Sequence, residues 1–344
     1  MKHSRLAIRK SLTQRAQLAE RSWAAWEPDE TKNGGFDEMA LDEWNRRPAR
    51  QEPNSQQRVL PGEEADRQAV VCALCGADDC ASVDVQRGYR AVECRRCRLV
   101  YLNPRPTPEW LARSYQSYLP ADADGVANWN RMMAGLYRST RRRMIDRFPS
   151  GGRLLDVGCA HGHFLEIMRN GGWQVEGIEI CEPAVAACQR KGLPVQTATL
   201  ATADLPPVRY DAVTMFYVLE HVTDPMGGLR RIHTSLKPGG LLVVRVPDTT
   251  PIVKLFARLG CRTGLYDPPY HLFDYSPRVL ARMLRETGFQ NVRIEIDAAT
   301  RPARLRPRLV SLTASWFGRL LQSLSGGRLL LPGVSKTAMA EKQF

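Results

Sequence analysis

The sequence lacks the long apolar runs of a membrane-spanning protein. In 344 residues, nowhere do eighteen apolar residues follow one another, so we expect no membrane-spanning helix. The first residues also lack the continuous apolar stretch of a secretory signal, which favours a cytoplasmic protein. With 43% apolar and 25% charged residues, the composition excludes a collagen-like or wholly disordered chain.

Acidic residues are scarce in two segments of a chain whose formal net charge is +13. Residues 67–149 hold 14 basic and 8 acidic side chains, and residues 298–344 hold 8 and 1, whereas residues 150–297 are nearly neutral with 16 and 15. Basic segments of this kind either contact phosphates, anionic lipid or acidic substrates, or form ordinary solvated surface.

A disulfide framework is also absent, because four of the nine cysteines form two close pairs and the other five are scattered. The pairs are Cys72-x₂-Cys75 and Cys94-x₂-Cys97, eighteen residues apart. Two such pairs can turn four thiolates toward one tetrahedral zinc ion, and full coordination leaves no open position. We therefore predict a structural zinc ribbon over residues 67–103, with these four cysteines as the metal ligands.

From residue 153 onward, short apolar runs alternate with helical stretches. The runs that predict strands are residues 154–157, 174–179, 194–196, 211–217, 241–246 and 292–296. This alternation predicts an α/β fold with a doubly wound, Rossmann-like, mostly parallel sheet. Ahead of it, residues 104–149 have the spacing of a helical cap, and residues 1–66 are polar and predicted to be largely disordered.

A buried strand ending in an acid leads into a loop of small residues, Gly158-x-Ala160-x-Gly162. Such a loop lets the backbone approach a ligand closely, and ligands of doubly wound sheets bind beyond the carboxyl ends of the strands. Asp156 would repel the pyrophosphate of a dinucleotide but suits a cationic ligand. Glu179, which ends the next strand, can accept hydrogen bonds from two ribose hydroxyls. These features favour S-adenosylmethionine over NAD.

In this region the chain resembles the class I S-adenosylmethionine-dependent methyltransferases. The loop after Asp156 matches the family's Asp/Glu-x-Gly-x-Gly-x-Gly motif except at Ala160, residues 210–222 resemble its fourth strand and the segment after it, and residues 237–240 resemble its fifth-strand turn. The resemblance implies a seven-stranded sheet in a domain of residues 150–344, with an amphipathic insertion at about 301–328. The order of ribbon, cap and domain is similar to that of bacterial methyltransferases acting on sugars, lipid-linked glycans and secondary-metabolic acceptors.

The resemblance also implies which residues bind S-adenosylmethionine. The expected set is Asp156, Gly158, Cys159, Ala160, Gly162, Glu179, Ile180, Thr199 and Phe216. Thr199 stands where many relatives have an Asp that binds adenine, and a hydroxyl there would bind more weakly.

For a hydroxyl acceptor, methyl transfer needs two positioned reactants and removal of a proton. His221 follows the predicted fourth strand, where the acceptor should lie, and an imidazole suits a general base. Glu220 would orient His221 or contact the acceptor, and His271 resembles a family feature near the acceptor pocket; a structural role is the alternative for each. Related quinone-precursor O-methyltransferases that bind metal carry a further acid where Tyr217 stands, so no catalytic metal is expected.

Residues 301–328 combine apolar residues at helical spacing with flanking arginines. An interfacial helix on anionic lipid has this pattern, which predicts peripheral membrane contact. A helix that packs on the domain or covers the acceptor site would have it too.

The leading prediction is a methyltransferase that modifies a small-molecule, glycan or lipid-linked acceptor at oxygen, in the cytoplasm or at the inner face of the membrane. One alternative is an rRNA guanine-N methyltransferase whose zinc ribbon contacts RNA. The basic flanks suit phosphate, but the ribbon has few aromatic residues for base stacking, so nucleic acid is the less favoured partner. The other alternative is a catalytically silent binding protein, against which the intact Asp156 and Glu179 argue.

Overall fold

The computed structural model describes residues 66–260, 264–298, 305–326 and 330–343, all within one compact unit, Ser55–Phe344. The segment predicted to be disordered, residues 1–66, lies outside the described residues except for its last position. Within the described residues, no helix combines the length and the apolarity needed to cross a bilayer.

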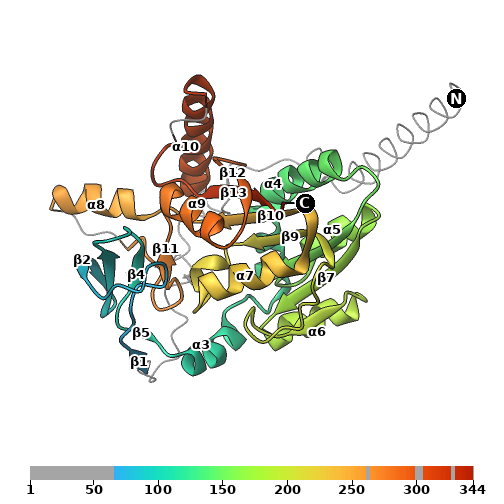
Figure 1. Ribbon diagram of the computed structural model, residues 1–344, viewed down its shortest axis with the longest axis horizontal. Coiled ribbons are helices and arrows are strands. Elements are labelled where there is room, and N and C mark those ends of the chain that lie inside the picture. The colour runs from blue at the N-terminus through green and yellow to red at the C-terminus, as the bar shows by residue number, and fades with distance from the viewer. Residues whose placement is uncertain (1–65, 261–263, 299–304, 327–329, 344) are drawn as a thin grey trace, which may run out of the picture. The chain divides into compact units, whose positions relative to one another are not determined.

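A seven-stranded sheet forms the centre of the fold (Figure 1). Its strands run in the spatial order β12 (Gln290–Glu295), β13 (Lys336–Glu341), β10 (Leu236–Val246), β9 (Tyr210–Phe216), β6 (Arg153–Val157), β7 (Gln174–Glu179) and β8 (Val195–Thr197). All neighbours pair in parallel except β13, which is antiparallel to both β10 and β12. The predicted fold class is confirmed, and β13 is the seventh strand, beyond the six runs identified in the sequence.

Successive residues of the central strands face opposite sides of the sheet, as strand geometry requires. Leu154 packs with α4 (Ala123–Arg147) and α5 (His163–Asn170), whereas Leu155 belongs to the core under α7 (Pro225–Ser235) and α9 (Pro277–Glu286). Both leucines are fully buried. The near-continuous apolar runs read from the sequence therefore reflect strands that are covered on both faces.

Helices begin where the sequence supplies an N-cap followed by proline. Asp224 accepts a hydrogen bond from the Gly227 N–H at the start of α7, and Ser276 caps α9 in the same way. A proline occupies the first helical position in both, where its missing N–H costs no hydrogen bond. The remaining helix of the sheet layer is α6 (Glu182–Arg190).

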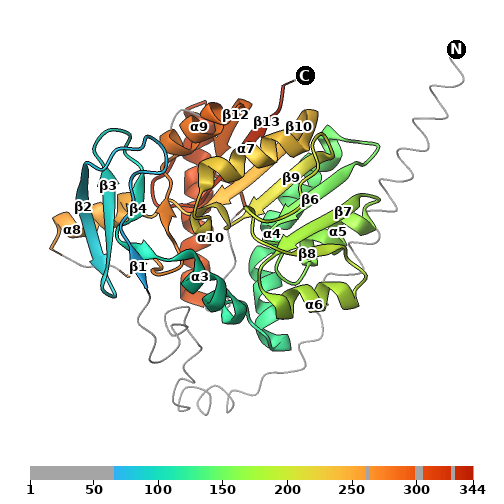
Figure 2. The same ribbon diagram turned by 60° about the horizontal axis from the view of Figure 1, so that its bottom comes forward.

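The cysteine module contributes three strands to a small four-stranded antiparallel sheet: β2 (Cys80–Gln86), β3 (Tyr89–Cys94) and β4 (Val100–Leu102). Figure 2 shows β2, β3 and β4 side by side. The fourth strand, β11 (Phe273–Asp274), comes from residues 150–344 and pairs with β4; it is labelled in Figure 1. A second, two-stranded sheet joins β1 (Arg67–Gln68) to β5 (Arg105–Pro106). The sequence did not reveal β11, because its pairing partner lies more than 170 residues earlier.

The predicted cap contains α3 (Pro108–Ser114), the 3₁₀ helix η2 (Tyr115–Ser117) and α4. Two further helices, α8 (Thr250–Arg258) and α10 (Leu305–Leu324), extend from the body of this unit in Figure 1. The first was not predicted from the sequence; the second lies in the segment predicted to be an amphipathic insertion.

Candidate active site

The loop between β6 and α5 is shaped by residues in the left-handed backbone region. Gly158, Ala160 and Gly162 have φ values of +69°, +48° and +75°. A Cβ on Gly158 would lie 2.4 Å from Val218 Cγ2, and one on Gly162 would lie 2.5 Å from Leu193 Cδ1. Glycine is therefore required at both positions by backbone conformation and by packing, while alanine at 160 is tolerated with a positive φ.

Asp156 lies within β6 rather than in the turn after it and is 2% exposed. Its Oδ1 accepts a hydrogen bond from Thr214 Oγ1 at 2.6 Å. Burial raises the pKa of the Asp156 carboxyl to about 7; the Thr214 hydrogen bond opposes this shift and the nearby Glu179 adds to it. No Lys or Arg among the described residues forms an ion pair with Asp156, so the site has a buried carboxyl group without a cation.

Glu179, at the carboxyl end of β7, is also buried. Its carboxylate accepts hydrogen bonds from the N–H groups of Ala160 at 2.9 Å, Ile180 at 2.8 Å and Cys181 at 2.9 Å. Burial raises the pKa of Glu179, and these three hydrogen bonds oppose the shift. Two desolvated carboxyl groups at neighbouring strand tips fit a ligand with a positively charged sulfonium and ammonium.

The other residues predicted to bind cofactor surround the same strand ends. Cys159 is buried beside the loop, and Phe216, the last residue of β9, packs edge-on against Phe164 with 5.1 Å between ring centroids. Thr199 follows β8, and its Oγ1 lies 3.0 Å from Thr202 Oγ1. The Thr199 hydroxyl is thus already engaged in a local turn.

The three residues predicted to act in catalysis lie together. Glu220 and His221 belong to the short helix η3 (Leu219–His221) after β9, and His271 precedes β11. Each offers a nitrogen or oxygen atom, and these atoms lie within 4.8 Å of one another; the ring centroids of the two histidines are also 4.8 Å apart. The fold therefore brings together two histidines, His221 and His271, that are fifty residues apart in the sequence.

The hydrogen bonds of His221 define its tautomer. Nδ1 lies 2.9 Å from the Tyr270 carbonyl oxygen and 2.9 Å from Tyr115 Oη. A carbonyl oxygen only accepts, so this contact assigns the proton to Nδ1 and leaves the lone pair on Nε2. Burial, with a contribution from His271, lowers the pKa of His221 to about 3, and burial lowers that of His271 to about 4. Both imidazoles are neutral at physiological pH.

Glu220 is fully buried, and neither carboxyl oxygen has a hydrogen-bond partner among the described residues. Burial raises the pKa of Glu220 to about 8, so the neutral acid predominates at pH 7. The cluster of Glu220, His221 and His271 therefore holds two neutral imidazoles and a neutral carboxylic acid, all capable of exchanging a proton.

Comparison with known proteins identifies the family. A model described as a methyltransferase domain matches residues 129–294. A ubiquinone biosynthesis O-methyltransferase of Chromobacterium violaceum is 34% identical over 161 residues, which are 43% of this chain and 69% of that protein. The chain belongs to the S-adenosylmethionine-dependent methyltransferases. S-adenosylmethionine is accordingly the cofactor of this methyltransferase.

Two more of the proteins similar to this methyltransferase can be described. A ubiquinone biosynthesis O-methyltransferase of Xanthomonas axonopodis pv. citri is 33% identical over 176 residues, 48% of this chain and 73% of that protein. The crystal structure of a SAM-dependent methyltransferase from Archaeoglobus fulgidus has a TM-score of 0.43 and 22% identity, covering 64% of this chain and 100% of that one.

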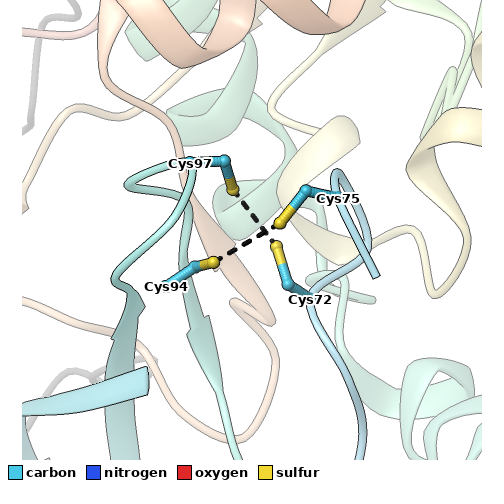
Figure 3. Close-up of side chains that lie close together, drawn as sticks. All are labelled: Cys72, Cys75, Cys94 and Cys97. Carbon is cyan, nitrogen blue, oxygen red and sulfur yellow. Dashed lines mark hydrogen bonds between the residues drawn. The ribbon is translucent and has the colours of Figure 1, made fainter. Parts of the chain in front are cut away.

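The cysteine module of the methyltransferase brings its four predicted ligands together (Figure 3). Cys72 Sγ lies 3.3 Å from Cys97 Sγ, and Cys75 Sγ lies 3.5 Å from Cys94 Sγ. All four sulfurs lie within 4.8 Å of one another and point toward a common centre. This donor set and its compactness fit a tetrahedral zinc ion.

Sequence reasoning missed the residues of the cap that reach the site. Tyr115 and Tyr118 lie in the segment predicted as a helical cap, and their ring centroids lie 5.8 Å and 5.7 Å from that of His221. Tyr118 also packs on Tyr270, with 4.8 Å between centroids. In the sequence, the only sign that the cap contributes to the site is a cluster of tyrosines just ahead of the methyltransferase domain. Such a cluster does not indicate which histidine the tyrosines contact.

Proposed function

We propose that this methyltransferase transfers a methyl group to a hydroxyl oxygen of a small-molecule acceptor, including one carried on a glycan or lipid. The observation that carries the proposal is the tautomer of His221, whose Nδ1–H donates to the Tyr270 carbonyl and leaves the lone pair on Nε2. The names of the two relatives, both O-methyltransferases of ubiquinone biosynthesis, support the same reaction class.

We assign cofactor binding to the strand tips. When bound, S-adenosylmethionine supplies a methyl group on a positively charged sulfur. Asp156 would attract the cationic end, and Glu179 would accept hydrogen bonds from ribose hydroxyls in addition to those from the backbone. The rest of the proposed contact set is Gly158, Cys159, Ala160, Gly162, Ile180, Thr199 and Phe216.

On the acceptor side, His221 Nε2 would receive the proton of the attacking hydroxyl. S-adenosylmethionine would supply the methyl group, and its sulfur would keep the electron pair of the carbon–sulfur bond, while His221 and Glu220 would position the acceptor oxygen that takes the methyl group. His221 becomes cationic, and its Nδ1–H remains bonded to the Tyr270 carbonyl. Glu220, protonated at neutral pH, would donate a hydrogen bond to the acceptor or orient His221, and His271 would contact the acceptor.

We further propose that Cys72, Cys75, Cys94 and Cys97 bind one structural zinc ion. Three strands of a module this small bury little apolar surface by themselves, so a metal ion would contribute much of the folding free energy. Metal analysis of the purified protein should give one zinc per chain. Cys94→Ser should lose it, whereas Cys80→Ser, outside the cluster, should keep it.

Peripheral membrane contact through residues 301–328 stays a proposal, supported by exposed apolar side chains. Among the described residues, α10 exposes Leu309, Trp316, Phe317, Leu320 and Leu324. This helix contains no acidic residue, and anionic lipid would complement its arginines. Flotation with phosphatidylglycerol vesicles, and none with phosphatidylcholine vesicles, is the expected result; Trp316→Ser together with Phe317→Ser should abolish it.

The decisive experiment is incubation of the pure protein with S-adenosyl-[methyl-³H]methionine and fractionated cell extract. Label should enter a small-molecule or lipid fraction as an ether that resists mild base. His221→Ala should eliminate the label while binding the cofactor normally. Label in rRNA, or none in any fraction, would contradict the proposed function.

A further inference from the structure

The 3₁₀ helix η2 touches both halves of the active site. We call residues 115–118 the clasp. Tyr115 Oη lies 2.9 Å from His221 Nδ1 on the acceptor side. The next residue, Gln116, donates from Nε2 to the Ile180 carbonyl at 3.0 Å and accepts at Oε1 from the Glu182 N–H at 3.0 Å, on the cofactor side. Adjacent residues of one short helix thus contact two sites that are separate in the sequence.

The hydrogen bonds of Gln116 fix the orientation of the backbone N–H of Cys181, which donates to Glu179. The peptide between Ile180 and Cys181 is planar, so its C=O and its N–H are fixed together. Gln116 holds the C=O, and the N–H of Cys181 donates to Glu179 Oε1 at 2.9 Å. An amide side chain from the cap therefore orients an N–H group that holds the carboxylate proposed to bind ribose.

Two further contacts fix the clasp on this segment. The Cys181 thiol lies 3.6 Å from the Gln116 carbonyl oxygen, and Gln116 Nε2 also lies 3.3 Å from the Ala112 carbonyl within α3. On the other side, Tyr118 packs against Tyr115 with 5.4 Å between centroids. The clasp is consequently anchored through both side chains and backbone.

We propose that the clasp couples the two halves of the site: Gln116 is a positioning residue for cofactor binding, and Tyr115 is a positioning residue for His221. The proposal rests on the proposed function, because it assigns the cofactor to Glu179 and the acceptor to His221. Removing the Gln116 amide should weaken cofactor binding, and removing the Tyr115 hydroxyl should change proton transfer. The two effects should be separable in kinetics although the residues are neighbours.

Calorimetry with S-adenosylhomocysteine tests the first half without turnover. Gln116→Ala should raise the dissociation constant about tenfold, as expected for the loss of its two hydrogen bonds to Ile180 and Glu182, and should raise KM for S-adenosylmethionine with kcat within twofold. Gln116→Glu should bind at least as weakly, because a carboxylate would face the Ile180 carbonyl. Gln189→Ala, an exposed glutamine of α6, is the matched control and should bind like the wild type.

Tyr115→Phe tests the second half. It should leave the S-adenosylhomocysteine dissociation constant within twofold, while lowering kcat several-fold and shifting the pH profile of kcat, since His221 Nδ1–H loses one of its two acceptors. Tyr210→Phe is the matched control: it removes a hydroxyl that donates to Glu176 at 2.8 Å at the amino end of β9, away from the site. This control should leave the pH profile unchanged.

The outcomes separate the clasp from the proposed function. If the wild-type protein does not bind S-adenosylhomocysteine, the proposed function fails. If it binds and Gln116→Ala binds equally well, or if either clasp variant lowers cofactor affinity, kcat and the melting temperature in parallel, the clasp is overturned while methyl transfer stands.

Discussion

The proposed site has two halves that are built differently. The N–H groups that hold the Glu179 carboxylate all lie within residues 160–181, whereas the groups bonded to His221 come from two distant stretches, 115–118 and 270–271. On the cofactor side, backbone N–H groups hold a carboxylate. On the acceptor side, side chains and a distant carbonyl hold an imidazole. The carboxylate and its N–H partners belong to loops near one another in the sequence, so the sequence could predict them. The partners of the imidazole are distant in the sequence, so only the folded chain reveals them.

Electrostatics also differ between the two sides. On the proposed cofactor side, neither of the two buried carboxyl groups, Asp156 and Glu179, forms an ion pair with a Lys or Arg in the described part of the chain, which favours a cationic ligand. On the proposed acceptor side, His221, His271 and Glu220 are uncharged near pH 7, because the pKa values of the two histidines are lowered and that of Glu220 is raised. One half of the site is therefore suited to binding charge and the other to moving a proton.

The largest expected effect comes from His221→Ala. Loss of a positioned base should lower kcat by about 10³-fold, while the S-adenosylhomocysteine dissociation constant measured by calorimetry stays within twofold. If His221→Ala also lost cofactor affinity, the claim that the two sides of the site act separately would be wrong.

Glu179→Ala should have the next largest effect, on binding. It removes the acceptor of three backbone N–H groups and should weaken S-adenosylhomocysteine binding about 100-fold. Glu176→Ala on the same strand, whose carboxylate pairs with Arg209, is the control and should bind normally. Equal losses in both variants would mean that the effect is on strand stability.

The pH dependence of cofactor binding tests the electrostatic difference between the two sides of the site. Asp156 has a pKa of about 7 in the free protein, and its ionised form should bind a cation better. Affinity for S-adenosylmethionine should therefore rise about tenfold between pH 6 and pH 8, and Asp156→Asn should flatten this rise.

The free energy of unfolding should change with pH in the opposite direction: Asp156 should make it fall as the pH rises. Its pKa is raised above the unfolded value, so it stabilises the fold fully below about pH 4, and this contribution is lost as the pH rises through about 7. Chemical denaturation of the cofactor-free protein at pH 5 and pH 8 measures it. Asp156→Asn should lose less stability than the wild type over this interval.

Thr199→Ala should have the smallest effect. Its hydroxyl is already bonded to Thr202, so cofactor affinity should fall no more than about threefold. A loss above tenfold would show that Thr199 contributes to the cofactor site as strongly as the strand-tip acids do.

Several features could be predicted from residue patterns because they depend on local chemistry. Gly158 and Gly162 adopt positive φ values that other residues rarely accept, so their spacing marks the loop. Cys-x₂-Cys pairs place two thiols on one turn, so Cys72 to Cys97 mark a cluster before any fold is known. The strand–helix alternation after residue 153 is likewise local, and it predicted the sheet correctly.

The partners of those residues could not be predicted in the same way. Leu272 illustrates the reason: its carbonyl accepts from the Leu102 N–H at the edge of the cysteine module, and its N–H donates to the Glu220 carbonyl at 2.8 Å. Neither bond leaves a sequence signal, because any residue except proline could donate its N–H. The link between the cysteine module and η3 is thus invisible until the chain is folded.

The sequence by itself determined the strand–helix alternation after residue 153, the small-residue loop after β6 and the set of four thiols, since each depends on the backbone preferences and spacing of neighbouring residues. Only the tertiary structure decided that Tyr115 contacts His221, that Gln116 contacts Ile180, and that the buried Glu220 carboxyl has no hydrogen-bond partner among the described residues. Burial and desolvation depend on what surrounds a group from all sides, and most of that surrounding chain is distant in sequence.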